Sequence, residues 1–309
     1  MSMSNRAESF LVGLIGEGVS PSLTPPMHEK EADVQGLRYL YRPIDLLELS
    51  LPGSAVGDLL TAASRLGYNG LNITHPCKQL VLPFLDEVSE DARRLAAVNT
   101  VLIKEGRFIG HNTDFSGFGS ALASGLPDAG LDRVVQLGAG GAGSAVAYAL
   151  LSAGVRTLDL VDVDPARCAE RAAELAALFP GSTVTARTTA ELPQLMPLAD
   201  GLVHCTPVGM AAHPGLPLDM SLVEPRHWVA DIVYRPIETQ LVLEARAKGC
   251  RVLDGGRMAV GQAADAFRIF TGRDADPERM RAHFLELVSA EESTAEGSKS
   301  DKALAGAGH

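Results

Sequence analysis

The stretch VVQLGAGGAG at residues 134–143 constrains the fold more than any other part of the sequence. A short apolar run enters a turn with glycine at its first, third and sixth positions, and an alanine-rich segment of helical character follows. Gly138 allows the tight turn, Gly140 lets bare backbone approach a pyrophosphate, and Gly143 lets the helix pack close to the strand. The start of the helix presents free N–H groups and a positive dipole end to the anion. The stretch therefore predicts a dinucleotide-binding unit.

A second apolar run, residues 157–162, supports this interpretation because it ends in Asp162. This acid follows the glycines by roughly 20 residues, where the ribose-binding carboxylate of such units belongs. A glycine trio alone fits an ordinary loop equally well. The acid at this distance is what favours a dinucleotide site.

Composition narrows the classes of protein to which the chain can belong. Its 309 residues suffice for two domains, and 46% hydrophobic with 21% charged residues is typical of a globular protein. The net charge of −11 argues against a nucleic-acid or anionic-membrane partner. The polar start resembles no signal peptide, and no apolar run is long enough to span a bilayer. Four scattered cysteines predict free thiols in a reducing cytoplasm, and the eight histidines lack metal-ligand spacing, so we expect no metal site.

The first third of the chain alternates between strand and helix patterns. Strands are predicted at residues 10–16, 39–44 and 69–74, with Pro43 placing the second at an edge. A helix is predicted over residues 56–66, and another begins at Pro76 and runs towards Leu85. Residues 99–103 and 107–110 flank Glu105-Gly106 and predict a hairpin.

The rest of the chain has the alternation of a doubly wound sheet. Strands at residues 183–186, 201–204, 228–233 and 251–253 are separated by helical patterns. Two final helices, residues 258–269 and 277–288, have no strand between them and are expected to cross back over the first domain. We therefore predict a two-domain α/β protein. The first domain comprises residues 10–113 and 257–288, a Rossmann domain comprises residues 114–256, and residues 289–309 form a disordered tail.

Several polar residues of the first domain follow its strands, where ligands collect in open α/β sheets. They are Ser22, Thr24, Thr74, Lys78, Asn99 and Asp114. Most fit ordinary turn or capping roles equally well, and Asp114 fits a helix N-cap. Lys78 is more telling, because the start of a helix disfavours a cation and an ordinary surface lysine has little reason to lie there.

Six short motifs occur along the chain with a characteristic spacing. They are SLTPPMH at residues 22–28, NITHPCK at 72–78, AVNT at 97–100, HNTD at 111–114, DIVYRP at 231–236, and GGRM at 255–258 with Gln262 after it. Together they resemble the shikimate/quinate dehydrogenase family, in the same order and from about residue 12 to residue 284.

The resemblance implies roles for individual residues. Lys78 and Asp114 would carry out acid/base work, and Ser22, Thr24 and Tyr234 would hold the substrate carboxylate. Asn72, Thr74, Asn99 and Gln262 would surround the ring and its hydroxyls. The residues implied to bind the cofactor are Gly138, Gly140, Gly141, Ala142, Gly143, Asp162, Arg167, Thr206, Pro207, Val208, Met210, Gly255 and Met258. Without the family pattern, Gln262 fits an exposed helix residue and Tyr234 an amphipathic core residue.

Two departures from the family pattern bear on the subtype. Thr24 replaces the second serine of shikimate-specific enzymes and resembles the quinate/shikimate branch, where it can meet the C1 hydroxyl of quinate. Residues 162–164 are Asp-Val-Asp, where many biosynthetic members carry Asn-Arg-Thr with an arginine that clamps the NADP phosphate. Asp162 suits a ribose diol, whereas a phosphate dianion would be repelled, so NAD is favoured and NADP is less favoured. Arg167 is close enough to keep NADP open, although it also fits a surface pair with Glu170. Cys77 and Cys205 also depart from the pattern and affect only details of the pocket.

The sequence thus predicts an NAD-dependent oxidoreductase that reversibly oxidises the C3 hydroxyl of quinate or shikimate in the cytoplasm. The small-molecule substrate would bind in the cleft between domains of a monomer or homodimer. Three alternatives stay open at this point. They are an NADP-dependent biosynthetic shikimate dehydrogenase, an enzyme for an amino-substituted relative of quinate, and a non-catalytic dinucleotide-binding regulator.

Overall fold

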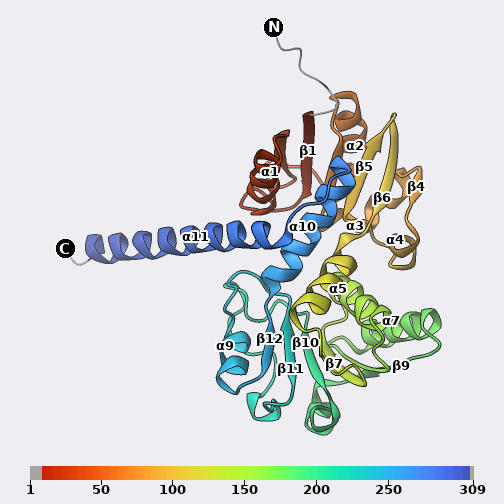
Figure 1. The fold of residues 1–309 in the computed structure, drawn as a ribbon, viewed down its shortest axis with the longest axis vertical. Helices are drawn as coiled ribbons and strands as arrows, with labels where there is room; N and C mark the ends of the chain where they lie inside the picture. Colours follow the sequence, from red (N-terminus) through yellow and green to blue (C-terminus); the bar gives the residue numbers. More distant parts are fainter. Residues whose placement is uncertain (1–8, 307–309) are drawn as a thin grey trace.

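The computed structural model describes residues 9–306, and it contains two α/β domains stacked one above the other (Figure 1). Each domain is built on a six-stranded sheet. The first sheet takes its strands from residues 9–111 and the second from residues 133–253. The two-domain α/β class predicted from the sequence is confirmed.

The first domain contains a mixed sheet with strand order β2-β1-β3-β5-β6-β4. Its strands are β1 (Ser9–Gly16), β2 (Arg38–Asp45), β3 (Gly70–Ile73), β4 (Glu87–Val88), β5 (Thr100–Lys104) and β6 (Arg107–His111). Its helices are α1 (Thr24–Val34), α2 (Val56–Arg65), α3 (Cys77–Leu80) and α4 (Glu90–Arg94). Strand β1 is parallel to β2 and β3, and β5 is antiparallel to β3 and β6. The proline-bearing strand β2 lies at the edge, as predicted.

The predicted hairpin between β5 and β6 is present, and its turn explains why the sequence signal was clear. Glu105 and Gly106 have φ angles of 53° and 78°. A two-residue turn that matches the twist of its strands requires positive φ at both central positions. The helix predicted from Pro76 towards Leu85 is shorter than expected. Helix α3 ends at Leu80, and a 3-10 turn follows at Leu82–Phe84.

The second domain is a fully parallel sheet with strand order β12-β11-β10-β7-β8-β9. Its strands are β7 (Arg133–Leu137), β8 (Thr157–Val161), β9 (Thr183–Arg187), β10 (Gly201–His204), β11 (Trp228–Asp231) and β12 (Arg251–Leu253). The helices between them are α6 (Gly141–Ser152), α7 (Pro165–Leu178), α8 (Leu192–Leu195) and α9 (Gln240–Ala247). Read from β9, this is the strand order of the doubly wound dinucleotide-binding fold. The strand order reverses between β7 and β10, where such folds bind their ligands.

Two helices join the domains and pack on each other. Helix α5 (Thr113–Gly125) leaves the first domain, and α10 (Gly255–Thr271) returns from the second (Figure 1). Their backbones meet at two glycines. A Cβ atom at Gly117 would lie 2.6 Å from the backbone nitrogen of Gln262, and one at Gly261 would lie 2.7 Å from the carbonyl oxygen of Gly117. Because real Cβ atoms do not approach so closely, the crossing requires glycine at both positions.

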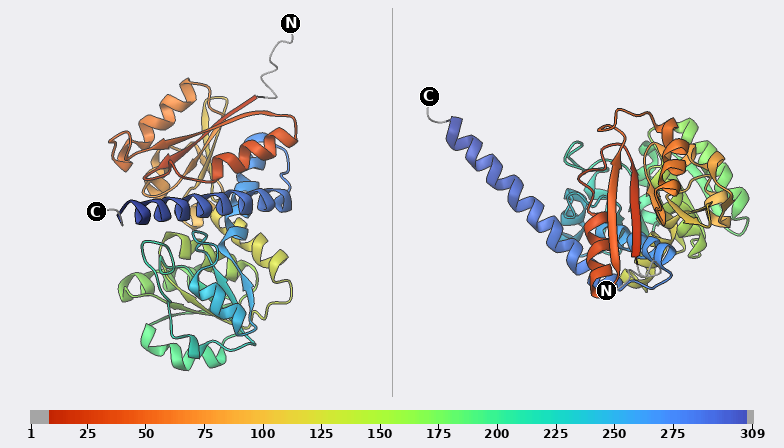
Figure 2. Two further views of the ribbon diagram at one scale, coloured as in Figure 1. Left: turned by 90° about the vertical axis from the view of Figure 1, so that its left-hand side faces the viewer. Right: turned by 90° about the horizontal axis from the view of Figure 1, so that it is seen from above.

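The last helix, α11 (Pro277–Gly306), packs against α1 and α10 and then extends away from the body of the protein (Figure 2). Arg279 attaches its first turns to α1 through two hydrogen bonds to Glu31, at 2.6 and 2.8 Å. The sequence predicts a disordered tail over residues 289–309, but α11 continues through Gly306, and residues 307–309 lie outside the described part. Alanine, glutamate and lysine in this segment are strong helix formers, which accounts for the difference. None of the helices within residues 9–306 has both the length and the apolar character required to cross a membrane.

The close crossing of α5 and α10 predicts opposite effects for two identical substitutions in α5. Gly117→Ala places a methyl group against Gln262 and should lower the free energy of unfolding by about 1–3 kcal/mol. At Gly119 a Cβ would meet no atom within 4 Å, so Gly119→Ala should raise it by about 0.5–1 kcal/mol. Urea unfolding of both variants measures the difference. Equal stabilities for the two variants would show that the crossing tolerates a side chain.

Candidate active site

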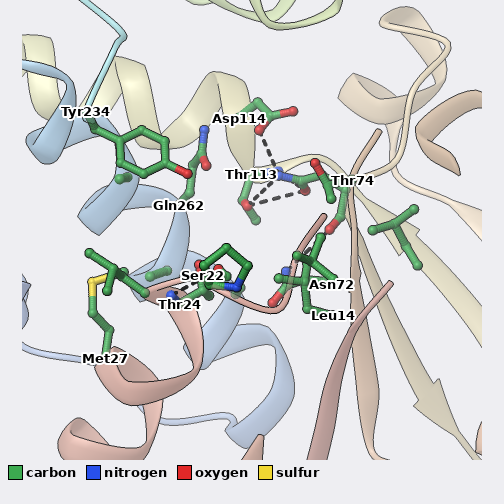
Figure 3. Close-up of a pocket in the computed structure, with 18 of the residues that line it drawn as sticks. Leu14, Ser22, Thr24, Met27, Asn72, Thr74, Thr113, Asp114, Tyr234 and Gln262 are labelled. Atoms are coloured by element: carbon green, nitrogen blue, oxygen red, sulfur yellow. Dashed lines mark hydrogen bonds between the residues drawn. The ribbon is translucent and has the colours of Figure 1, made fainter. Parts of the chain in front are cut away.

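A cavity of about 300 Å³ lies between the two domains, and its lining contains the residues predicted to bind substrate (Figure 3). The structure brings Ser22, Thr24, Asn72, Thr74, Lys78, Asn99, Asp114, Tyr234 and Gln262 to its walls. Most of these residues belong to the first domain or to helices α5 and α10. Tyr234 comes from the loop after β11 in the second domain. Residues far apart in sequence therefore converge on one polar cavity.

Lys78 and Asp114 form an ion pair in this wall, with 2.6 Å between Nζ and Oδ2. The side chain of Lys78 is 25% exposed and that of Asp114 is 6% exposed. The contact with Asp114 accounts for the unusual position of Lys78. Helix α3 has only four residues, so its dipole is weak, and the carboxylate of Asp114 holds the ammonium in place.

Asp114 is not the N-cap of α5. The cap is Asn112, whose Oδ1 accepts a hydrogen bond from the backbone N–H of Asp114 at 2.9 Å. Asp114 is the second residue of the helix, where the positive end of the dipole favours a carboxylate. The alternative of a merely capping aspartate is therefore wrong.

Asn99 holds the start of α5 and the carboxylate of Asp114 together. Its Nδ2 donates to Asp114 Oδ1 at 3.0 Å, and its Oδ1 accepts from the backbone N–H of Thr113 at 2.7 Å. Thr113 also lines the cavity, and its hydroxyl oxygen lies 3.0 Å from Asn99 Nδ2. Thr113 is not among the residues predicted from the sequence, although its place between a capping asparagine and Asp114 could have indicated it.

Asn72 is fixed by hydrogen bonds at both ends of its amide. The hydroxyl of Tyr41 donates to its Oδ1 at 2.5 Å, and its Nδ2 donates to Thr100 Oγ1 at 2.9 Å. Burial raises the pKa of Tyr41 well above its usual value, so the phenol stays a donor. Tyr41 was also missed, because a tyrosine in an alternating strand pattern carries no sign of what lies beside it.

The segment that carries Ser22 and Thr24 is anchored by Asp45, at the end of β2. The carboxylate of Asp45 accepts backbone N–H bonds from Gly18, Ser20 and Leu47 at 2.9, 2.9 and 3.0 Å. Ser22 Oγ accepts from the backbone N–H of Thr24 at 3.3 Å, and Thr24 begins α1. The segment is therefore held before any ligand binds.

Tyr234 and Gln262 lie on the side of the cavity formed by the second domain and α10. Tyr234 is 41% exposed, and Figure 3 shows its hydroxyl directed towards the interior of the cavity. It is thus not the core residue that its pattern also allows. Gln262 lies where α10 crosses Gly117, which rules out the exposed helix residue that its pattern also allows.

The glycine-rich turn has the geometry that its spacing predicts. Gly138 has a φ of 101°, and a Cβ there would lie 2.6 Å from the carbonyl oxygen of Cys205. A Cβ at Gly143 would overlap the carbonyl oxygen of Gly138, whereas Gly140 faces open space. A second cavity of about 450 Å³ is lined by Gly141 and Ala142 and also by Thr74, Lys78 and Asp114. Open space thus connects the start of α6 with the Lys78–Asp114 pair.

Asp162 follows β8 and accepts hydrogen bonds from three residues. Its donors are Ala139 N at 2.6 Å, Asp164 N at 2.9 Å and Arg167 Nη2 at 2.6 Å. Burial alone would raise the pKa of Asp162, but these donors outweigh it and lower the pKa below its usual value. Arg167 therefore pairs with Asp162, and the surface pair with Glu170 is not its main interaction.

Comparison with known proteins identifies the family. The family model for the shikimate dehydrogenase substrate binding domain matches residues 14–101, and that for the shikimate 5'-dehydrogenase C-terminal domain matches residues 256–283. A shikimate dehydrogenase (NADP(+)) from Arthrobacter sp. (strain FB24) is 83% identical over 95% of this chain and 100% of its own length. The chain belongs to the shikimate dehydrogenase family.

Two further relatives of this dehydrogenase family carry a different cofactor in their names. A quinate/shikimate dehydrogenase (NAD(+)) from Corynebacterium efficiens is 54% identical over 91% of this chain and 99% of its own. The structure of a quinate dehydrogenase from Corynebacterium glutamicum in complex with NAD has a TM-score of 0.87 and 52% identity, covering 90% of this chain and 99% of that one. The predicted family, an oxidoreductase that uses a pyridine nucleotide, is confirmed. The relatives divide between NAD and NADP.

Other predicted cofactor residues of this dehydrogenase lie outside the two cavities, within the described part of the chain. They are Thr206, Pro207, Val208, Met210, Gly255, Met258, Asp162 and Arg167. Thr206 lies just beyond β10, and its hydroxyl lies 2.6 Å from Nε2 of buried His204, whose Nδ1 lies 2.9 Å from Asp231. This buried His204–Asp231 pair was not predicted from the sequence. Met258 is buried in the core of the second domain.

The four cysteines are buried free thiols. Within residues 9–306, no three histidine, cysteine, aspartate or glutamate side chains gather as a metal site would require.

The anchoring of the Ser22 segment by Asp45 predicts a pH dependence of stability. Burial alone would raise the pKa of Asp45, but the N–H groups of Ser20, Gly18 and Leu47 lower it from 3.8 to about 2. A carboxylate with a depressed pKa stabilises the fold above its unfolded value, and this contribution is lost as the pH falls through the folded value. The free energy of unfolding should therefore fall more steeply between about pH 4 and pH 2 in the parent protein than in Asp45→Asn. Parallel pH profiles from urea unfolding would contradict this role.

Proposed function

We propose that this dehydrogenase reversibly oxidises the C3 hydroxyl of quinate or shikimate, giving 3-dehydroquinate or 3-dehydroshikimate, with NAD as the hydride acceptor. The observation that carries the proposal is the Lys78–Asp114 ion pair, which lies in the walls of both cavities. One cavity contains the polar side chains for a ring acid, and the other reaches the start of α6. A proton-transfer pair thus lies where a substrate and a nicotinamide would meet.

In the proposed mechanism, the ammonium of Lys78 first passes one proton to Asp114 or to solvent. The neutral amine then takes the proton of the substrate hydroxyl as the carbinol carbon loses its hydride. The bound nicotinamide supplies the hydride acceptor. Asp114 orients the hydroxyl and shares its proton, while Asn99 keeps the carboxylate in position from the other side. In the reverse direction the lysine returns the proton. Both groups are held before substrate arrives, so little reorganisation is needed during the reaction.

The substrate assignment combines the cavity lining with the names of the relatives. Ser22, Thr24 and Tyr234 would hold the carboxylate of the ring acid, and Thr24 could also meet the C1 hydroxyl of quinate. Asn72, Thr74, Asn99 and Gln262 would surround the ring. The quinate/shikimate dehydrogenase from Corynebacterium efficiens supports a substrate range that includes both acids.

The two domains would bind different ligands. Residues 10–113 and 257–288 would form the substrate-binding domain, and residues 114–256 would bind the dinucleotide. The described free thiols support the cytoplasmic location expected from the sequence. A monomer or a homodimer remains the expected assembly.

The cofactor proposal depends on Asp162 and its neighbours. Asp162 is ionised and lies beside Asp164, so a ribose diol can donate to it, whereas a 2′-phosphate would meet two carboxylates. Arg167 could attract that phosphate only by leaving Asp162. The relative from Arthrobacter, named for NADP, makes the NADP-dependent shikimate dehydrogenase the second candidate.

Removal of the proposed acid/base group tests the mechanism. Lys78→Ala should lower kcat by about 10²–10⁴-fold, because a positioned general acid/base contributes that much. Lys104→Ala, which removes an exposed lysine at the end of β5, serves as the control and should leave kcat unchanged. Initial rates with circular dichroism spectra compare the variants. Near-normal turnover by a folded Lys78→Ala protein would exclude the mechanism.

Cofactor choice is tested by initial rates for quinate and for shikimate, each with NAD and with NADP. We expect turnover of both acids with a strong preference for NAD. Asp162→Asn removes one repelling charge and should shift the ratio of kcat/KM towards NADP by about tenfold or more. Turnover of shikimate with NADP alone would instead identify the second candidate.

A further inference from the structure

The substrate cavity contains a cation whose position none of the proposed roles explains. Among the described residues that line the cavity, the basic ones are Lys78 and Arg235. The charge of Lys78 is already balanced by Asp114 at 2.6 Å. Arg235 follows Tyr234 in the loop after β11 and lies beside the segment that carries Ser22, since its Nη2 donates to the carbonyl oxygen of Pro21 at 2.7 Å.

The hydrogen bonds of Arg235 leave part of its guanidinium unused. Nη2 also donates to both carboxylate oxygens of Glu291 on α11, at 2.6 and 2.8 Å. Nε is buried and has no hydrogen-bond partner in the described residues. Because Nε is not accessible, a ligand carboxylate would reach the guanidinium by replacing Glu291 on Nη2.

We propose that Arg235 binds the carboxylate of the ring acid and that Glu291 is its exchangeable counter-ion. This inference rests on the proposed function and adds a charged residue to the neutral side chains of Ser22, Thr24 and Tyr234. The side chain of Glu291 is 45% exposed, so it can turn to water when a substrate carboxylate takes its place. A charge-assisted hydrogen bond from a guanidinium is stronger than one from a hydroxyl.

The two cations then orient the substrate. Ser22 and Thr24 lie across the cavity from Asp114 in Figure 3. A ring acid whose carboxylate meets Arg235 on the Ser22 side presents its far hydroxyl to the Lys78–Asp114 pair. The counter-ion of Lys78, Asp114, is only 6% exposed and stays in place, whereas Glu291 is 45% exposed and can turn to water, so the reversed orientation gains less from charge.

The test separates recognition of a carboxylate from a merely structural role. Arg235→Met removes the charge and keeps most of the side-chain length. We expect KM for shikimate and quinate to rise about tenfold with little change in kcat. The inhibition constant of the neutral methyl ester of shikimate, measured against the acid, should stay unchanged. If Arg235 only fastens α11 to the Pro21 loop, acid and ester weaken together, and the proposal is overturned.

Two more variants complete the test. Arg156→Met removes an exposed arginine that pairs with Asp132 before β8, and it should change neither constant. Glu291→Gln removes the competing counter-ion and should lower KM for the acids about two- to fivefold, with no effect on the ester. A raised or unchanged KM in Glu291→Gln contradicts the exchange. If the parent protein turns over neither acid, the proposed function itself fails, and this is seen before any variant is compared.

Discussion

The contact between the backbones of α5 and α10 determines where the halves of the site lie. Helix α5 begins with Thr113 and Asp114, and α10 carries Gln262 at the level where the two helices touch. A hydrogen bond between Ser116 and Asp265 lies beside the crossing. Since α5 leaves the first domain and α10 returns from the second, the separation of these helices also sets the separation of the two sheets. A larger side chain at the crossing would move the carboxylate of Asp114, the amide of Gln262 and a whole domain together.

A chain of polar side chains links the first sheet to this crossing. It runs from Tyr41 on β2 to Asn72 on β3, then to Thr100 and Asn99, and ends at Asp114 on α5. Each member is buried, so each needs a partner, and each finds one in the next member. A buried carboxylate without partners would be expensive, but Asp114 has Lys78, Asn99 and the N-terminus of a helix. The Lys78–Asp114 pair is therefore held by a network and not by one ion pair alone.

Much of this arrangement could be predicted from the sequence, because its signals are local. The spacing of Gly138 and Gly143 reflects a turn within six residues, and Glu105-Gly106 specifies its own hairpin. Lys78 and Asp114 were predicted as a pair because the short motifs that carry them resemble those of a known family. The crossing of α5 and α10, by contrast, depends on Gly117 and Gly261, which lie 144 positions apart in the sequence and meet only in the fold.

The same limit explains the residues that were missed. Tyr41 and Asp45 lie on one strand and read as ordinary strand residues, yet one fixes Asn72 and the other fixes the Ser22 segment. Their roles depend on tertiary neighbours, which periodicity does not reveal. The helix α11 extends into the segment predicted to be disordered for another reason. Its alanine, glutamate and lysine content is typical of disordered tails but also favours a helix.

The nucleotide end of the molecule shows why a relative's name does not fix the cofactor by itself. The relatives named for NADP and for NAD are 83% and 54% identical to this chain. Overall similarity therefore favours NADP, whereas the carboxylate of Asp162 favours NAD. A ribose diol can add its hydrogen bonds to Asp162 while Arg167 stays in place. A phosphate must draw Arg167 away from an ion pair of 2.6 Å and then lie beside the carboxylate left behind. Both steps are unfavourable, and binding of the diol requires neither of them. This difference in binding free energy supports NAD as the cofactor.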